Sequence, residues 1–311
     1  MKKYVLIRLF NIVVTLFIIA TLTFFLMKQL PGSPFDEEKL AALPEDVRTA
    51  IYEQYGLNDP VWKQYIKYME NLVKGDLGKS FYYKDKPVAQ IISERIGPSA
   101  LLGIQAIVIG TAIGLILGIV AAFRHNSVWD YTTMILAVLG VSIPNFVFAA
   151  LLQYFVGLKL GVLPIAYWES YKSTVLPTLA LMFGVVSVVA RFMRNEMLDV
   201  LNQDYMTTAL AKGLSLRAII LNHALRNALI PVITVLGPVI VSLITGSLVI
   251  ESIFSIPGIG SLFVESIKVN DYSMIMGVTL LFSTLFVFVV LIIDLLYGVI
   301  DPRIRIAGNK E

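Results

Sequence analysis

Side chains that commonly perform catalysis or bind metals are scarce in this chain of 311 residues. It contains no cysteine and two histidines, His125 and His223. Thiolate metal sites, cysteine nucleophiles and disulfides are therefore excluded, and the two histidines are too far apart in sequence for a ligand pair. The patterns G-x-S-x-G and H-E-x-x-H are also absent. We expect a protein that performs no catalysis itself and binds no metal.

One short stretch imitates a nucleotide site. Gly78, Lys79 and Ser80 resemble the end of a phosphate-binding P-loop. That pattern requires another glycine five residues before Gly78, where this chain has Val73, and no apolar strand precedes the stretch. We expect no nucleotide site here, so if the protein uses ATP, a different chain binds it.

The composition indicates a membrane protein. Hydrophobic residues make up 57% of the chain and charged residues 15%, whereas soluble domains contain about 25% charged residues. The net charge of +3 is too small to indicate a nucleic acid partner. The lipid bilayer is the expected surrounding.

Six stretches without Asp, Glu, Lys or Arg are long enough to cross a bilayer, which needs about 20 mostly apolar residues per helix. We therefore expect an all-α integral membrane protein with six transmembrane helices. The spans are Leu9–Met27, Ile96–Phe123, Tyr131–Leu158, Ser173–Ala190 (extending to about residue 200), Asn227–Ile250 and Tyr272–Ile293. The connections are residues 28–95, 191–226 and 251–271, the last with room for an interfacial helix, and the ends are residues 1–8 and 294–311. Two amphipathic helices are expected within residues 40–55 and 61–74.

Basic residues beside the short loops predict the orientation, because Lys and Arg are enriched on the cytoplasmic side. Both termini and residues 191–226 are expected in the cytoplasm, and residues 28–95 outside it. This arrangement leaves three lysines in the short outer loops, at positions 159, 172 and 268. The inner positions are Lys2, Lys3, Arg8, Arg124, Arg191, Arg194, Lys212, Arg217, Arg226, Arg303, Arg305 and Lys310.

Small residues recur at every fourth position of the second span and so share one helix face. Such a face lets another backbone approach closely. Packing within the chain is the favoured interpretation, and a subunit interface is the alternative. The residues are Ala106, Gly110, Gly114, Gly118 and Ala122.

The apolar cores contain no charged residue that could couple transport to protons or ions. Gln105, Asn145 and Gln153 could line a polar path, although interhelical hydrogen bonds are the favoured use of each. Prolines at positions 144, 177, 231 and 238 can kink their helices. We expect the driving energy to enter from outside the bilayer.

The stretch from Asp204 to Pro231 is the longest polar interruption on the predicted cytoplasmic side. A short helix is expected over Tyr205–Lys212, with Gly213 in a left-handed conformation at its end and Ser215 capping a second helix. The bend could dock into a partner through Tyr205, Met206 and Leu214. A solvated basic loop remains the alternative at this point.

The same stretch resembles the EAA loop of binding-protein-dependent ABC importer permeases, whose pattern is E-A-A, three residues, G, nine residues, I-x-L-P. Ala209, Gly213 and Leu225 match it directly. The remaining places depart from the general pattern. Thr207 stands for Glu, Thr208 for the first Ala, His223 for Ile and Arg226 for Pro.

The departures resemble the B-type permease of oligopeptide and dipeptide importers, with D-Y-x-x-T-A-x-A-K-G-L and H-A-x-R-N-A-x-x-P. Further similar stretches are LPGSPF, YGLNDP, GDLGKS, TGSLVIESIFSIPGIG and DPRIR, so the resemblance covers nearly the whole chain. The first motif is matched by Asp204, Tyr205, Thr208, Ala209, Ala211, Lys212, Gly213 and Leu214. The second is matched by His223, Ala224, Arg226, Asn227, Ala228 and Pro231.

This resemblance implies the type I ABC importer permease fold in a bacterial inner membrane. The implied partners are a second permease subunit, two cytoplasmic ATPase subunits that bind ATP and Mg, and an extracytoplasmic peptide-binding protein. Peptide would cross by alternating access, with the loop at residues 204–226 coupling this chain to an ATPase. Importers of nickel, opines or glycan fragments have similar permeases, and a stand-alone channel or membrane sensor is the rival outside this class.

Overall fold

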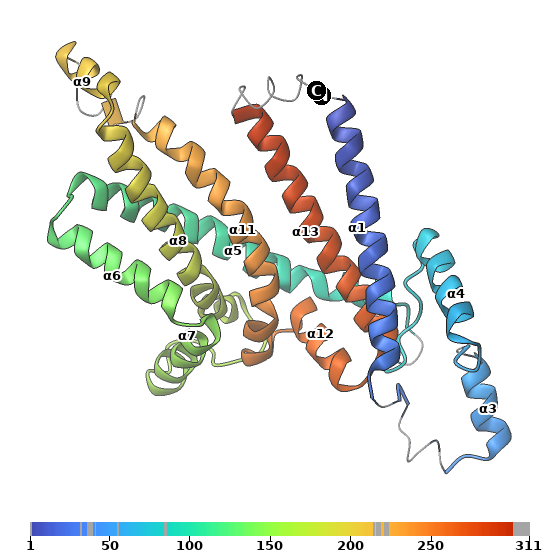
Figure 1. Cartoon of the computed structure of the whole chain (residues 1–311). Helices are drawn as coiled ribbons and strands as arrows, with labels where there is room; N and C mark the ends of the chain where they lie inside the picture. The colour runs from blue at the N-terminus through green and yellow to red at the C-terminus, as the bar shows by residue number, and fades with distance from the viewer. Residues whose placement is uncertain are drawn as a thin grey trace. The chain divides into compact units, whose positions relative to one another are not determined.

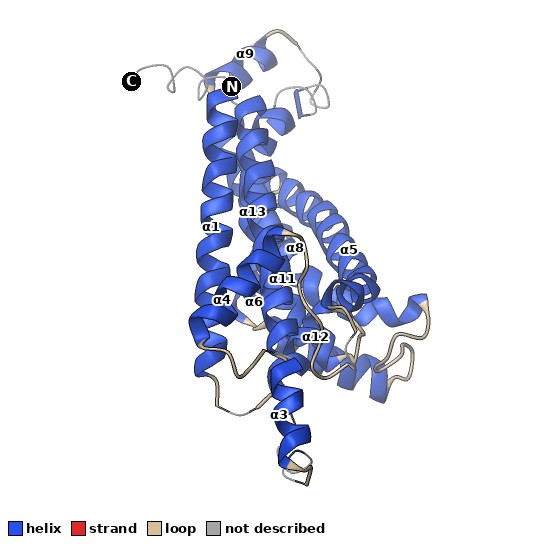
Figure 2. Ribbon diagram, turned by 90° about the vertical axis from the view of Figure 1, so that its right-hand side faces the viewer, coloured by secondary structure: helices blue, strands red, loops and turns tan. Residues whose placement is uncertain are grey.

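The computed structural model describes residues 2–31, 33–35, 40, 42–54, 56–83, 86–213, 215, 219–220 and 224–300. Figure 2 shows helices and connecting turns in this part of the chain, and no strand. The predicted all-α class is therefore confirmed. The chain divides into two compact units, Met1–Gly97 with Ser261–Val287, and Pro98–Gly260 with Phe288–Glu311.

The first unit includes a helix contact at the C-terminal end of a long apolar helix, α1. Its α4 helix packs on this end through aromatic rings, since the Phe24 ring lies 5.6 Å from that of Tyr68 and the Thr21 and Tyr65 hydroxyls are 2.8 Å apart. The two amphipathic helices expected in the long loop are confirmed as α3 and α4. The elements are α1 (Lys2–Gln29), α3 (Glu45–Gln54), α4 (Val61–Val73), the first part of α5 (Val88–Phe123), most of α12 (Ile259–Lys268) and the first part of α13 (Tyr272–Ile300).

A buried carboxylate fastens the loop after α4 to the start of α13. Asp271 is fully buried and accepts the Met274 amide at 3.2 Å, which caps α13. It also accepts the Ser80 hydroxyl and the Phe81 and Tyr82 amides, both at 3.3 Å. The Gly-Lys-Ser stretch therefore lies in a loop whose serine bonds a carboxylate of its own chain.

A second contact ties this loop to α12. The Tyr83 hydroxyl donates to a Glu265 carboxylate oxygen at 2.8 Å. Burial, followed by this hydrogen bond, raises the pKa of Tyr83. The phenol therefore stays protonated and remains a donor at physiological pH.

We expect Asp271→Ala to lower the thermal unfolding midpoint of the protein clearly. The substitution leaves up to four donors without their acceptor, and each buried unsatisfied group costs about 1 to 3 kcal/mol. Asp76→Ala is the matched control, because Asp76 is an exposed acid in the same loop that accepts the Gly78 amide. Equal midpoints for the two variants would show that Asp271 does not hold this junction.

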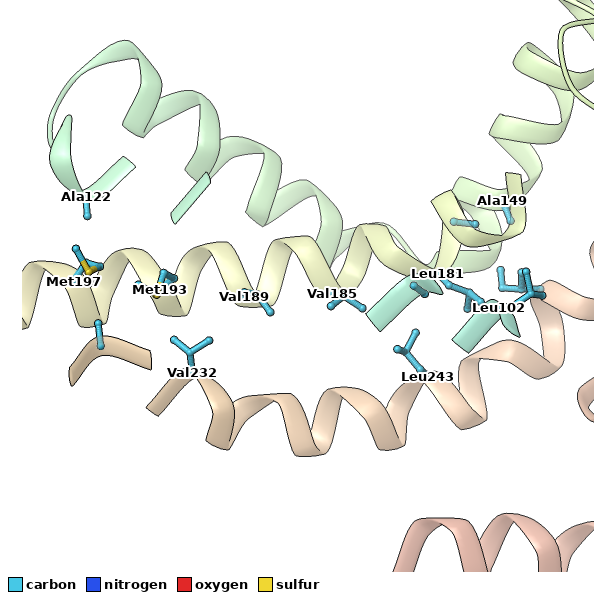
Figure 3. Packing of buried hydrophobic residues seen from close by; sticks show 14 of the residues in the cluster. Leu102, Ala122, Ala149, Leu181, Val185, Val189, Met193, Met197, Val232 and Leu243 are labelled. Carbon is cyan, nitrogen blue, oxygen red and sulfur yellow. The ribbon is translucent and has the colours of Figure 1, made fainter. Parts of the chain in front are cut away.

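The second unit is organised around α8. Figure 3 shows Val185, Val189 and Met193 along α8, with Val232 and Leu243 of α11 directed toward it. These side chains are buried in one apolar cluster. The elements are the rest of α5, α6 (Val128–Ser142), α7 (Asn145–Leu152), the π-helix η1 (Gln153–Lys159), the 3-10 helix η2 (Tyr171–Thr174), α8 (Val175–Leu201), α9 (Asp204–Ala211), α11 (Leu225–Ile253), the start of α12 and the end of α13.

Four helices in the described part of the chain are long and apolar enough to cross a membrane, and a bent helix pair could add a fifth span. The four are residues 6–29, 88–123, 171–201 and 272–293. The fifth predicted run lies in α11, where residues 227–240 form a shorter apolar segment. Six spans therefore stay a prediction. α5 begins at Val88, so the last part of the predicted long loop is helical.

The third predicted span, Tyr131–Leu158, is not one straight helix. α6 ends at Ser142, α7 begins at Asn145, and the pair is bent by 104°. Pro144 explains the break because its ring forces Ile143 out of the helical region, to φ −86° and ψ 119°.

The other prolines do not break their helices. Pro177 occupies the first turn of α8, where a missing amide hydrogen costs no intrahelical bond. Helix α11 continues through Pro231 and Pro238. Only Pro144 therefore separates two helices, and the sequence position alone does not tell Pro177 from it.

Candidate functional site

The predicted docking stretch begins as a separate short helix. Asn202 and Gln203 separate the end of α8 from α9, and Figure 1 shows α9 at the end of α8. Asp204 lies in the first turn of α9, where a negative charge is favourable next to the helix dipole. The short helix predicted over Tyr205–Lys212 is confirmed within one residue at each end.

Gly213 forms an exposed bend after α9. Its φ is +73°, as predicted for a left-handed residue at a helix end. A Cβ atom built on it would meet none of the described residues beyond its chain neighbours within 4 Å. Ala211 and Lys212 beside it are also exposed, so the bend presents a small, open surface.

The inner face of α9 is anchored to its own chain. Met206 is 2% exposed and belongs to the apolar cluster that contains Met193 and Met197 of α8. Tyr205 accepts a hydrogen bond at 3.1 Å from the Asn227 amide of α11. The expectation that Met206 anchors a partner is therefore wrong, because the core already buries it.

The structure describes some of the remaining motif residues and not others. Asp204, Thr208 and Lys212 are exposed, and Leu225 opens α11 against the core. Thr207 and Ala209 are residues of α9, and Arg226 is a residue of α11. Leu214, His223 and most of the second helix expected after Ser215 lie outside the described residues.

The small-residue face of α5 packs against α8 of the same chain. A Cβ on Gly110 would come within 2.9 Å of Val185 Cβ, and one on Gly114 within 2.8 Å of Val189 Cβ. On Gly118 it would lie 2.6 Å from the Ala190 carbonyl oxygen. Ala106 and Ala122 at the two ends of the face are buried, and Figure 3 shows Ala122 directed toward Met197. The face thus sets how closely the two helices approach.

The two glutamines proposed for a path form hydrogen bonds between segments. Gln105 of α5 accepts the Thr178 hydroxyl of α8 at 2.8 Å and donates to the Tyr171 hydroxyl at 3.0 Å. Gln153 donates to the carbonyl oxygens of Ile165 at 2.9 Å and Ile253 at 3.1 Å.

Asn145, the third residue proposed for the path, is the first residue of α7. A Cβ on Gly184 of α8 would lie 3.5 Å from its side-chain oxygen. The Asn145 amide therefore lies beside the backbone of α8 at Gly184.

An ion pair joins α6 and α8 that the sequence did not indicate. Arg194 was counted only among the basic residues of the cytoplasmic side, but its side chain is 18% exposed within α8 and binds Asp130 of α6 at 2.6 Å. In the sequence, the acidic Asp130 lies just before the third apolar run and the basic Arg194 lies just after the fourth, both on the predicted cytoplasmic side. That pattern did not indicate which charges meet.

Comparison with protein families decides the class of this chain. The model of the family described as binding-protein-dependent transport system inner membrane component matches residues 114–306. The model of the N-terminal part of such membrane components matches residues 1–100. The chain belongs to this family of transport system inner membrane components.

Full-length relatives of this inner membrane component are peptide permeases. The dipeptide transport system permease protein of Bacillus subtilis is 47% identical over 308 residues, covering 98% of this chain and 99% of the relative. The oligopeptide transport system permease protein of Haemophilus influenzae is 45% identical over 307 residues, covering 98% and 100%. That of Escherichia coli K12 is 43% identical over the same length.

A solved structure supports the fold of the inner membrane component. A crystal structure of an amino acid ABC transporter with histidines matches with a TM-score of 0.50 and 13% identity. The match covers 67% of this chain and 93% of that chain. At this identity, the likeness concerns the fold alone.

Proposed function

We propose that this chain is one of two permease subunits of an ATP-driven importer that takes up oligopeptides or dipeptides by alternating access. The observation that carries the proposal is the full-length identity of 42% to 47% with dipeptide and oligopeptide transport permeases. The exposed bend at Gly213, next to a helix tied into the core, is the feature that fits a coupling role.

In this proposal an ATPase subunit docks on the exposed side of residues 204–213. Its movement displaces α9, whose Met206 is buried in the apolar cluster that includes α8 residues and whose Tyr205 is hydrogen-bonded to Asn227 of α11. The displacement therefore reaches two helices of the core together. Rigid-body movement of packed helices is a common way to switch a membrane protein between two states.

The proposal also assigns the rest of the assembly. The chain crosses a bacterial inner membrane six times with both termini in the cytoplasm, so α9 faces the ATPase. ATP and Mg bind to two ATPase partners, and an extracytoplasmic binding protein delivers the peptide to the outer side. The long loop with α3 and α4 then lies on the side of the binding protein.

Purification through a tag on this chain tests the assembly. We expect a second permease subunit and two ATPase subunits to co-purify, and vesicles containing the complex to accumulate labelled peptide when ATP and the binding protein are supplied. An azido-ATP probe should label the ATPases and leave this chain unlabelled. A homo-oligomer that conducts without ATP would instead support a channel.

The cargo is tested separately in the same vesicles. Unlabelled dipeptides and longer peptides should compete for uptake. Competition by nickel, an opine or a glycan fragment, without competition by peptides, would retain the importer and overturn the peptide assignment. Labelling of this chain by azido-ATP would overturn the division of labour between permease and ATPase.

A further inference from the structure

Asp130 and Arg194 form a bidentate ion pair between α6 and α8. The Arg194 Nε donates to Asp130 Oδ1 at 2.6 Å, and its Nη2 donates to Oδ2 at 2.8 Å. The backbone N–H of Asn126 donates a third hydrogen bond to this carboxylate at 3.0 Å, and Asp130 is 1% exposed. Such a contact fixes both the distance and the relative rotation of the two groups.

The same turns of α8 are held by α5. A Cβ on Gly118 would lie 2.7 Å from Met193 Cβ and 3.1 Å from the Arg194 amide nitrogen, so the backbones are already in close approach. Helices α5 and α6 are consecutive and joined by the short turn Arg124–Ser127. Both arms of this hairpin therefore contact the end of α8 that leads to α9.

The contact lies close to the docking helix along the apolar cluster. Met193 and Met197 of α8 flank the turn that carries Arg194, and both belong to the cluster that contains Met206 of α9. A displacement of α9 would thus act on the part of α8 that forms the ion pair with Asp130. Apolar contacts are not directional, so by themselves they do not fix how α6 follows such a movement.

We infer that the Asp130–Arg194 pair is a positioning contact that makes the α5–α6 hairpin move together with α8 and α9 during transport. The inference rests on the proposed coupling role of residues 204–213. Asp130 is buried and Arg194 is 18% exposed, so opening the pair would leave the buried carboxylate without its partner, which makes the closed pair a stiff connection. Without the pair, α9 would still move, and less of the movement would reach the hairpin.

The decisive variant is Asp130→Asn with Arg194→Met, in the complete importer. It removes both charges together, so no unpaired charge remains buried, and the introduced amide oxygen can still accept the Asn126 amide. Arg191→Met is the matched control, because Arg191 is an exposed residue on the same helix and its loss removes the same positive charge. The readout is the number of ATP molecules hydrolysed per peptide taken up by vesicles.

We expect the double variant to assemble normally and to use about tenfold more ATP per peptide, in the range of typical coupling between sites. Arg194→Lys keeps the charge and loses the bidentate geometry, so it should raise the ratio to a smaller extent. Arg191→Met should keep the ordinary ratio. An ordinary ratio in the double variant would overturn the inference and leave the pair a purely structural role.

Two further measurements keep the inference testable. If the double variant does not assemble, the Arg194→Lys ratio decides, and an ordinary ratio there overturns the inference. Gly213→Asp, measured in parallel, tests the coupling role itself. Uncoupling by Gly213→Asp with an ordinary ratio in the double variant would reject the ion-pair inference alone, while normal transport by Gly213→Asp would reject the proposed coupling role.

Discussion

Gly213→Asp is expected to abolish most peptide uptake while the complex still assembles. A Cβ atom at this position meets none of the described residues beyond its chain neighbours within 4 Å, so we expect the substitution to fit at the bend. It places a charge on the open bend, where a docked partner would have to desolvate it, and we expect uptake to fall by a factor of about ten or more. Binding-protein-stimulated ATP hydrolysis and uptake of labelled peptide in vesicles give the measurement.

Gly75→Asp separates coupling from backbone strain. Gly75 also has a positive φ, +78°, and open space around its Cβ position. The two substitutions add the same charge and the same strain, of order 1 kcal/mol for a left-handed residue other than glycine. Only the change at residue 213 should uncouple ATP hydrolysis from uptake, and equal uptake by both variants would contradict the docking role of the bend.

Gly118→Leu is expected to prevent normal packing of α5 on α8. The first added carbon alone would lie 2.6 Å from the Ala190 carbonyl oxygen, which is backbone and cannot rotate away. Overpacking of this kind destabilises by about 3 kcal/mol. We expect a lower yield of folded protein and a clearly lower thermal unfolding midpoint of the purified complex.

Gly103→Leu is the control on the same helix. A Cβ at Gly103 meets nothing within 4 Å, and the change from glycine to leucine brings the same gain in helix propensity. The difference between the two variants therefore measures the steric effect at residue 118. Similar midpoints would mean that α5 and α8 can separate at Gly118 without loss of stability.

The sequence determined the features that depend on neighbouring residues. Apolar runs of about 20 residues predicted helices because backbone groups in lipid must pair within the helix. Gly213 predicted its own left-handed conformation, since glycine lacks the Cβ that makes this region costly. The small residues at every fourth position predicted a close helix contact, and the motifs from Asp204 onward predicted the family.

The tertiary structure decided which groups meet. Pro144 and Pro177 were equal candidates for a kink, but Pro177 lies in a first helical turn and leaves α8 unbroken. Arg194 was expected on the cytoplasmic side with no named partner, and the rotation of α8 brings it to Asp130. Met206 was expected to anchor a partner, and it is buried instead in the apolar cluster of its own chain. These outcomes depend on helix starts, rotations and distances, which are set by contacts between residues far apart in the chain.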